Sequence, residues 1–297
     1  MYNILRFEKL LIGISIGLAV LSAVSLAVWG LKLGIDFTGG TQMRVSFSEQ
    51  RPEIESVKSS LQTLELGDVS VQPTEEKEYI LKLKPIDNDT RQKVLENLNT
   101  AFPGTQETSF ESIGPSVGAE LKSKAIKAII IVLVAIVLFI TWAFRKTSKG
   151  PVPSWVYGMA AIIALAHDIF ITTGIFSFLT WWKGIEVDSL FITALLTILG
   201  FSVHDTIVVF DRIREHLKTS SSSFREIINE SINSTMMRSL NTSLATLLVL
   251  LALFIFGGAS IQYFVLTLII GIILGTYSSI FIASPLLLVF QKFLKRS

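Results

Sequence analysis

The hydrophobic and polar positions divide the chain into long apolar runs and one segment with a different pattern. A membrane-spanning helix needs roughly 20 mostly apolar residues to cross a hydrocarbon core about 30 Å thick. Six runs meet this requirement: Leu10–Leu31, Ala125–Phe144, Trp155–Leu179, Leu190–Phe210, Ser239–Phe256 and Phe264–Phe290. The pattern therefore predicts a membrane α-helical protein with six transmembrane helices.

Residues 32–124, between the first and second runs, follow the shorter periods of strands and amphipathic helices. The expected elements are a strand at Thr41–Phe47, a helix at Pro52–Leu64, strands at Val69–Val71 and Tyr79–Leu83 around a turn at Pro73-Thr74, a second helix capped by Asn88 or Asp89, and a strand at Thr105–Ile113. This β-α-β-β-α-β order is typical of a ferredoxin-like α+β module. The predicted organisation is residues 1–31 for the N-terminus and first span, 32–124 for this inserted domain and 125–297 for the other spans.

Lysine and arginine residues in the short connections indicate the orientation of the spans. The basic segments are Arg6 with Lys9, then Arg145 with Lys146 and Lys149, then Arg212, Arg214, Lys218 and Arg225, and finally Lys292, Lys295 and Arg296. With six spans they fall on one side, which predicts cytoplasmic N- and C-termini and an extracytoplasmic domain at residues 32–124. A cleaved signal peptide is the alternative for the first run, but its length of about 21 residues favours a retained anchor.

Composition agrees with this picture and excludes some partners. Half of the 297 residues are hydrophobic and only 17% are charged. A net charge of +2 gives no reason to expect a nucleic-acid partner. The chain contains no cysteine, which excludes disulfides and thiolate metal sites.

Two His-Asp pairs inside the apolar runs are the main candidates for functional chemistry. His167-Asp168 lies midway along the third run, and His204-Asp205 lies in the fourth. A charged side chain at the centre of a span costs about 2.5–3.5 kcal/mol, so such residues usually face protein or water and often have a function. Arg238 begins the fifth run, and antiparallel packing of the fourth and fifth spans would bring it to a depth comparable to that of Asp205. A carboxylate beside an arginine forms a titratable switch.

These residues also have a structural interpretation. A buried aspartate can hydrogen-bond a hydroxyl on a neighbouring span and only fix helix packing. For Asp168 both interpretations stay open, whereas for Asp205 the nearby Arg238 favours a functional role. Adjacent His and Asp side chains project about 100° apart on a helix, so they are poor joint ligands and no metal site is expected. No nucleophile–base pair is recognisable in the spans, so the chain is not expected to be an enzyme.

Four ordered motifs resemble those of the SecD and SecF protein-export membrane proteins. They are Gly34–Thr41 after the first run, Ser112–Gly118 before the second, Ser202–Glu215 in the fourth and Arg238–Ser243 in the fifth. The first motif contains the family signature Gly34, Asp36, Phe37, Gly39, Gly40 and Thr41. The small inserted domain resembles the SecF branch. Apart from the resemblance, Gly39-Gly40 and Gly114–Gly118 are interpreted as flexible joins between the domain and the spans.

The resemblance implies membership of the resistance–nodulation–division superfamily and a place in the bacterial plasma membrane. It implies SecD as a partner beside the SecYEG channel, where a proton or sodium gradient helps to pull a translocating unfolded polypeptide outward. The other expected partners are membrane lipids, and no cofactor is expected. It assigns ion-pathway positions to Asp205 and Arg238 and, less directly, to Asp168. His204 departs from the asparagine common in this motif and adds a second titratable group. The alternatives are an ion-coupled half-transporter for a small molecule or lipid, and an assembly subunit that only stabilises SecD.

Overall fold

The computed structural model describes residues 3–145 and 150–295, which form two compact units. One unit, here called the membrane unit, combines Met1–Lys32 with Lys127–Ser297. The other, here called the sheet unit, is Leu33–Ile126. Lys146, Lys149 and Arg296, which belong to the basic segments of the sequence, lie outside the described residues.

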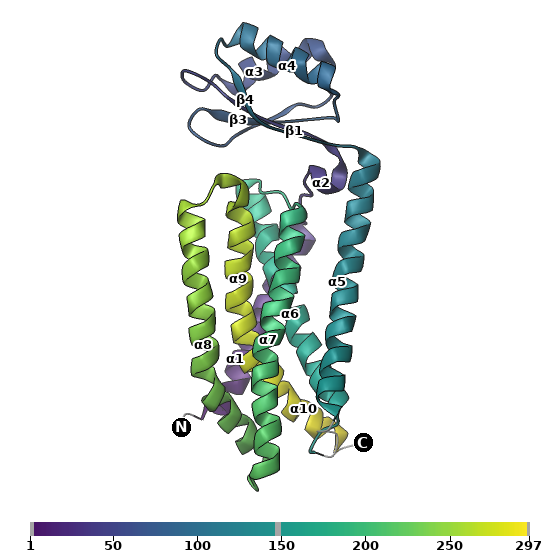
Figure 1. Cartoon of the computed structure of the whole chain (residues 1–297), viewed down its shortest axis with the longest axis vertical. Coiled ribbons are helices and arrows are strands. Elements are labelled where there is room, and N and C mark those ends of the chain that lie inside the picture. The colour runs from purple at the N-terminus through teal and green to yellow at the C-terminus, as the bar shows by residue number, and fades with distance from the viewer. Residues whose placement is uncertain (1–2, 146–149, 296–297) are drawn as a thin grey trace. The chain divides into compact units, whose positions relative to one another are not determined.

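Within the described residues, six long helical segments are apolar enough to cross a membrane, as the sequence pattern predicts. They are α1 (Glu8–Val28) preceded by η1 (Ile4–Phe7), then α5 (Pro115–Ala143), α6 (Ser154–Lys183), α7 (Ser189–Thr219), α8 (Phe224–Phe256), and a last span formed by η4 (Ala259–Ile261), α9 (Gln262–Ser278), η5 (Ser279–Ala283) and α10 (Ser284–Leu294). Figure 1 shows that α1 begins and α10 ends at the same end of the bundle, as an even number of spans requires.

Several helices differ in length from the apolar runs that predicted them. α5 begins at Pro115, well before the expected Ala125, because proline is well suited to the first helical turn, where its missing N–H has no role. α1 ends at Val28, before the expected Leu31, and Gly30 then takes a positive φ of 64°. α8 begins at Phe224, and Ser223 and Glu226 form a capping box at this end of the helix. The apolar runs therefore mark only parts of longer helices.

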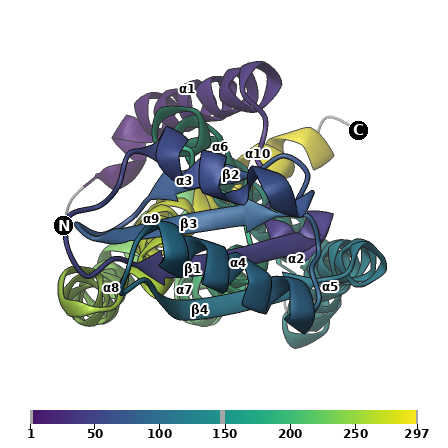
Figure 2. The ribbon, with the colours of Figure 1, turned by 90° about the horizontal axis from the view of Figure 1, so that it is seen from above.

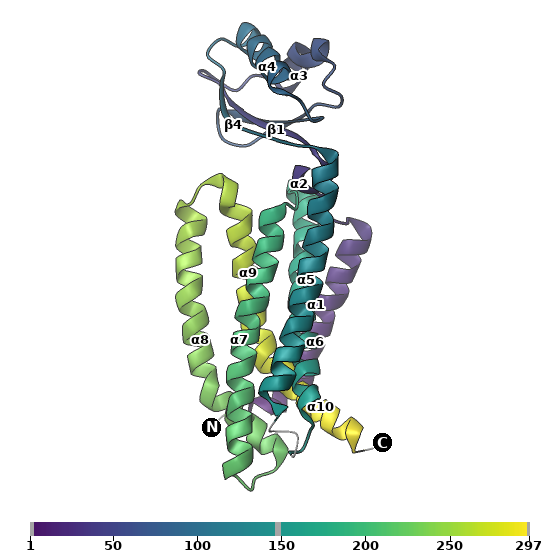
Figure 3. The ribbon, with the colours of Figure 1, turned by 45° about the vertical axis from the view of Figure 1, so that its right-hand side comes forward.

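The centre of the membrane unit is formed by α6, α7 and the last span. Their apolar stretches are 44%, 44% and 61% buried, against 17% for α1, 6% for α5 and 17% for α8. Two glycines let α9 approach α7 closely: a Cβ at Gly271 would lie 2.1 Å from the Ile198 side chain, and one at Gly275 would lie 2.8 Å from that of Ser202. Small residues at such positions are typical of helix packing in membranes, and α7 and α9 lie side by side in Figures 1 and 3.

The last span contains a π-helical turn at Ser279–Ala283, just before Pro285. The sequence pattern predicts a single run here, and the structure adds this interruption. Proline has no N–H, and in a regular α-helix its ring clashes with the carbonyl group four residues earlier, here that of Phe281. A π-turn widens the helix locally and relieves this conflict.

The sheet unit contains a four-stranded antiparallel sheet in the order β2-β3-β1-β4. Its elements, in chain order, are α2 (Ile35–Thr38), β1 (Gly40–Ser46), α3 (Ile54–Leu61), η2 (Gln62–Leu64), β2 (Ser70–Pro73), β3 (Glu78–Leu83), α4 (Asn88–Ala101) and β4 (Gln106–Ile113). Figure 2 shows α3 and α4 lying over one face of the sheet. Alternation along the strands places Met43, Val45 and Leu81, all fully buried, beneath these helices.

The cap of α4 differs from the expectation. Asp87, rather than Asn88 or Asp89, is the N-cap, because its backbone is extended and its carboxylate accepts a 2.9 Å hydrogen bond from the backbone N–H of Thr90. Hydrogen bonding to Thr90 also lowers the pKa of Asp87. Asn88 and Asp89 are instead the first two residues of the helix.

The turn between β2 and β3 also lies later than expected. Pro73 still pairs with Tyr79 across the two strands, so the turn begins at Thr74. Proline is tolerated here because β2 is an edge strand of the sheet.

Arg91 fastens α4 to β4, the edge strand at the other side of the sheet. Its guanidinium donates hydrogen bonds to both carboxylate oxygens of Glu107 and lies 4.6 Å from the centre of the Phe110 ring. The hydrogen bond to Glu107 raises the pKa of Arg91. This pair is structural and holds a helix against the sheet.

Candidate functional site

Asp168 is completely buried at the point where three spans meet. Its Oδ2 accepts hydrogen bonds from Ser202 Oγ on α7 and from Ser278 Oγ at the end of α9, both at 2.7 Å. Its Oδ1 lies 3.1 Å from Nδ1 of His167. We call Asp168, His167, Ser202 and Ser278 the closed cluster, because both carboxylate oxygens have partners inside the bundle.

The π-turn extends the closed cluster toward α7. Ser279 Oγ donates to the backbone carbonyl of Ser202 at 3.1 Å and lies 2.8 Å from Thr206 Oγ1. Two consecutive hydroxyls of the last span, those of Ser278 and Ser279, therefore contact α6 and α7 respectively. Because each hydroxyl has a partner, this region can hold the three central spans in register.

Asp205, one helical turn after Ser202 on α7, has different surroundings. Its residue surface is 2% exposed, its Oδ1 lies 3.8 Å from His204 Nδ1, and its Oδ2 makes no hydrogen bond with any described residue. Ser239 on α8 is buried beside it, near enough to act on the carboxylate, although its hydroxyl lies within the 3.5 Å hydrogen-bond distance of no acceptor among the residues described. We call Asp205, His204, Ser239 and Arg238 the open cluster.

Arg238 and His204 lie on the outer surface of the membrane unit. The His204 side chain is 61% exposed, and Arg238 is also exposed. Arg238 is near enough for its charge to act on Asp205, but the two residues form no direct ion pair. Because α7 packs against α8, Asp205 and Arg238 lie near each other, as the sequence predicts, but the carboxylate and the guanidinium are not in contact.

One argument from the sequence is wrong in its geometry. Adjacent His and Asp side chains on a helix were expected to point apart, yet the His167 ring lies within hydrogen-bond distance of Asp168. Rotation of the two side chains offsets the 100° between their Cα–Cβ directions. Within residues 3–145 and 150–295, no group of three or more His, Cys, Asp or Glu side chains is arranged to hold a metal ion.

The glycine pair after the first span is a close-packed join, which corrects its interpretation as a flexible exit. Gly39 has a φ of 74°, and a Cβ on it would lie 2.8 Å from Pro115 Cα. A Cβ on Gly118 would in turn lie 2.8 Å from the backbone N of Gly39. Gly40 follows with a φ of 138°. The start of α5 can therefore approach the residue before β1 this closely only because Gly39 and Gly118 have no Cβ.

The remaining signature residues build the same join. The carbonyl of Gly34 accepts the N–H of Phe37, a buried residue, and Asp36 lies in the first turn of α2. Thr41 is fully buried in β1, and its hydroxyl lies 2.8 Å from that of Ser112 in β4. The signature thus forms a compact structural corner in the sheet unit.

Sequence reasoning missed a contact just after the C-terminal end of α1. The Lys32 amine lies 3.0 Å from the Glu186 carboxylate, and the backbone carbonyl of Lys32 accepts a 2.8 Å hydrogen bond from the Val187 N–H. These contacts tie the exit of the first span to the connection between α6 and α7. Lys32 is too far in sequence from Glu186 and Val187 for a local pattern to reveal these contacts.

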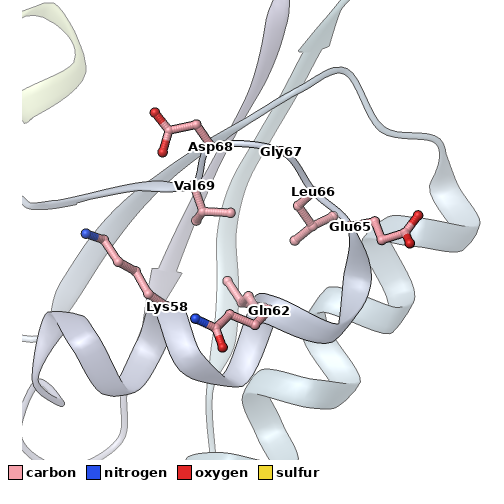
Figure 4. A pocket seen from close by; sticks show the side chains of 8 residues that line it. Lys58, Gln62, Glu65, Leu66, Gly67, Asp68 and Val69 are labelled. Atoms are coloured by element: carbon pink, nitrogen blue, oxygen red, sulfur yellow. The ribbon is translucent and has the colours of Figure 1, made fainter.

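A depression of about 520 Å³ in the sheet unit does not assemble catalytic groups. It is lined by Lys58, Leu61, Gln62, Glu65, Leu66, Gly67, Asp68 and Val69. Figure 4 shows the Lys58 amine and the Glu65 carboxylate pointing away from each other, and Asp68 extending outward from the loop. No acid–base pair forms among these side chains, and the depression is best described as a solvated surface.

Comparison with known proteins identifies the family. The family model described as protein export membrane protein SecD/SecF, C-terminal, matches residues 93–293, and that of the SecD/SecF GG motif matches residues 24–50. The chain belongs to the SecD/SecF family. The GG-motif match includes Gly39 and Gly40, the close-packed pair described above.

Relatives of this SecD/SecF chain are named as translocase subunits, which are transport components. It is 42% identical to "Protein translocase subunit SecF" of Thermobaculum terrenum, over 97% of this chain and 93% of that protein. It is 39% identical to the subunit of the same name from Vibrio alginolyticus, over 96% of this chain and 88% of that protein.

Solved structures of SecDF share the fold. The crystal structure of SecDF from Thermus thermophilus, described as a translocon-associated membrane protein, matches 98% of this chain at 34% identity with a TM-score of 0.83. SecDF in a super-membrane-facing form matches 99% of it at 33% identity with a TM-score of 0.70. This chain spans 39% of each of those longer chains.

Proposed function

We propose that this chain is a SecF-type subunit that uses a proton or sodium gradient, together with SecD, to promote export of unfolded polypeptides through SecYEG. The observation that carries the proposal is the open cluster. A buried carboxylate with a free oxygen, next to an exposed histidine and within reach of an arginine's charge, has the composition of an ion-binding switch. The closed cluster lacks that free oxygen, so we assign Asp168 chiefly to packing.

The exposure of the open cluster supports a partner at this face. His204 and Arg238 would otherwise meet lipid, where a charge at mid-span costs about 2.5–3.5 kcal/mol. A partner subunit covering α7 and α8 would supply a polar or hydrated surface. The SecDF chains that share this fold are longer, and SecD is the part that this chain would require.

The proposed location is the bacterial inner membrane, with both termini in the cytoplasm. Residues 32–124 would then lie outside as a ferredoxin-like domain between the first two spans. The chain order of the strands and helices and the sheet order support this domain type. The contacts of Lys32 with Glu186 and Val187 offer a route by which a movement of α6 and α7 reaches the segment leading into that domain.

The energetics are compatible with such coupling. One elementary charge moving through 100 mV releases about 2.3 kcal/mol, which is enough to bias a conformational equilibrium of similar size. Binding or release of a cation at Asp205 would change its attraction for Arg238 and thus the packing of α7 against α8. Movement of a polypeptide would follow from that packing change.

The test is Asp205→Asn in the assembled complex. Completion of translocation would be measured in membrane vesicles after ATP is exhausted, with the ion gradient present. We expect gradient-dependent completion to be lost while co-purification with SecD stays normal. Asp211→Asn is the matched control, because Asp211 is an exposed carboxylate on the same helix, paired with Arg214. Unchanged export in Asp205→Asn would instead leave a subunit that only stabilises SecD.

A further inference from the structure

A small basic pocket lies where α5 and α7 end together. It has a volume of about 270 Å³ and is lined by Trp142, Ala143, Arg145, Arg214 and Lys218. Among the lining residues that the structure describes, three of the five are cationic and none is acidic. Pockets for drug-sized ligands are commonly about 300–1,000 Å³, so this one suits a single compact anionic group.

The positive charge of this basic pocket is only partly neutralised. Arg214 lies 3.0 Å from Asp211, and its guanidinium has further N–H groups. Arg145 and Lys218 form no ion pair with a carboxylate anywhere in the described ranges 3–145 and 150–295. Stacking orders the side chains instead: the Arg145 guanidinium lies 4.6 Å from the centre of the Trp142 ring. The pocket therefore presents positioned donors with a net positive charge.

An apolar stripe on α5 leads directly to the basic pocket. Ile130, Val134, Leu138 and Trp142 follow at intervals of four residues, so they share one helix face, and each is more than half exposed. Only 6% of the apolar stretch of α5 is buried. The last member of the stripe, Trp142, also lines the pocket, and tryptophan at a span's end is typical of the membrane–water interface.

We propose that the basic pocket binds the phosphodiester headgroup of an anionic phospholipid whose acyl chains lie along the α5 stripe. Arginine N–H groups match phosphate oxygens in bidentate geometry, and lysine adds a point charge. The stripe distinguishes a lipid from a soluble phosphate, because it offers apolar area only to a ligand with chains. The net positive charge favours phosphatidylglycerol over phosphatidylcholine, whose cationic choline group opposes the pocket charge. This site is separate from the open cluster and does not depend on ion coupling.

The proposal can be tested by lipid titration of the purified full chain in detergent, with bound lipid counted by native mass spectrometry. The probes are phosphatidylglycerol, phosphatidylcholine with the same chains, and glycerol phosphate. The pocket variant is Arg145→Gln with Lys218→Gln. The control, Lys292→Gln with Lys295→Gln, removes the same charge from α10 and the residue after it, outside the pocket.

We expect phosphatidylglycerol to bind more tightly than the other two probes. Each cation near an anionic headgroup is worth about a five-fold change in affinity, so the pocket variant should lose on the order of twenty-five-fold and the control less than about two-fold. Equal losses in both variants would overturn the site. Equal binding of the choline lipid would overturn the charge selectivity, and glycerol phosphate binding as tightly as the lipid would overturn the role of the stripe. An unchanged thermal midpoint in the pocket variant shows that a loss of binding is not a loss of folding.

Discussion

The two His-Asp pairs of the membrane unit share the same dipeptide but have opposite surroundings. Asp168 accepts hydrogen bonds from two serines on two other spans and contacts its neighbouring histidine. Asp205 keeps one oxygen without a partner in the described structure, and its histidine faces outward. A buried charge that is fully hydrogen-bonded stabilises one arrangement of helices, whereas one with unmet capacity can respond to an ion. The comparison teaches that the dipeptide marks polar positions, and that the neighbouring spans decide their roles.

The largest difference should appear when each aspartate is removed. Asp168→Ala leaves the hydroxyl of Ser202 without an acceptor and that of Ser278 with only the Gly275 carbonyl, so we expect a loss of about 2–4 kcal/mol in the free energy of unfolding. Asp205→Ala should cost less than about 1 kcal/mol, because it removes few hydrogen bonds. Unfolding of the purified chain in a graded SDS–detergent series measures both.

Asp168→Asn is the control for this pair. Its amide oxygen still accepts from both serines, so it should retain more stability than Asp168→Ala. If Asp205→Ala proved as destabilising as Asp168→Ala, the division into a closed and an open cluster would be wrong.

The sequence could predict which residues to compare but not how they differ. Six spans and the order of strands and helices follow from periodicities within short windows, and the aspartates stand out because they interrupt apolar runs. The partners of Asp168 lie 34 and 110 residues away, at Ser202 and Ser278, so only the folded bundle brings them together. The tight approach of Gly39 to Pro115 is equally non-local, although the motif that contains it was recognisable.

A glycine substitution next to the closed cluster tests how tightly it is packed. Gly275→Ala would place a Cβ 2.8 Å from the Cβ of Ser202, which should cost about 1–3 kcal/mol through overpacking. Gly200→Ala on the facing helix α7 is the control, because nothing lies within 4 Å of its Cβ position and alanine favours a helix by up to about 1 kcal/mol. The same SDS unfolding series reports both. Equal effects would mean that the closed cluster can relax around an added methyl group.

Replacing the two histidines should change stability in the same order as replacing the two aspartates, with a smaller difference between the two variants. The His167 side chain is 10% exposed and contacts Asp168, so His167→Ala should cost about 1 kcal/mol, the value of a typical buried hydrogen bond. His204→Ala should change stability by no more than about 0.5 kcal/mol, as for other exposed positions. Thermal midpoints of the two variants in detergent would show this order. A reversal would mean that His204 has a structural partner within the same chain.

The sharpest contrast in sign concerns the serines of the two clusters. Ser202→Ala removes a hydrogen bond to Asp168 and should destabilise the chain by about 0.6–1.7 kcal/mol, from the average to the largest value found for interhelical hydrogen bonds in a membrane protein. Ser239→Ala removes a buried hydroxyl that has no partner in the described structure, so it should leave stability unchanged or raise it slightly. The unfolding midpoints of the purified variants decide the sign. A loss at Ser239 as large as that at Ser202 would show that the free oxygen of Asp205 is already engaged by this hydroxyl. Asp205 would then be held as firmly as Asp168, and the open cluster would have no capacity left for an ion.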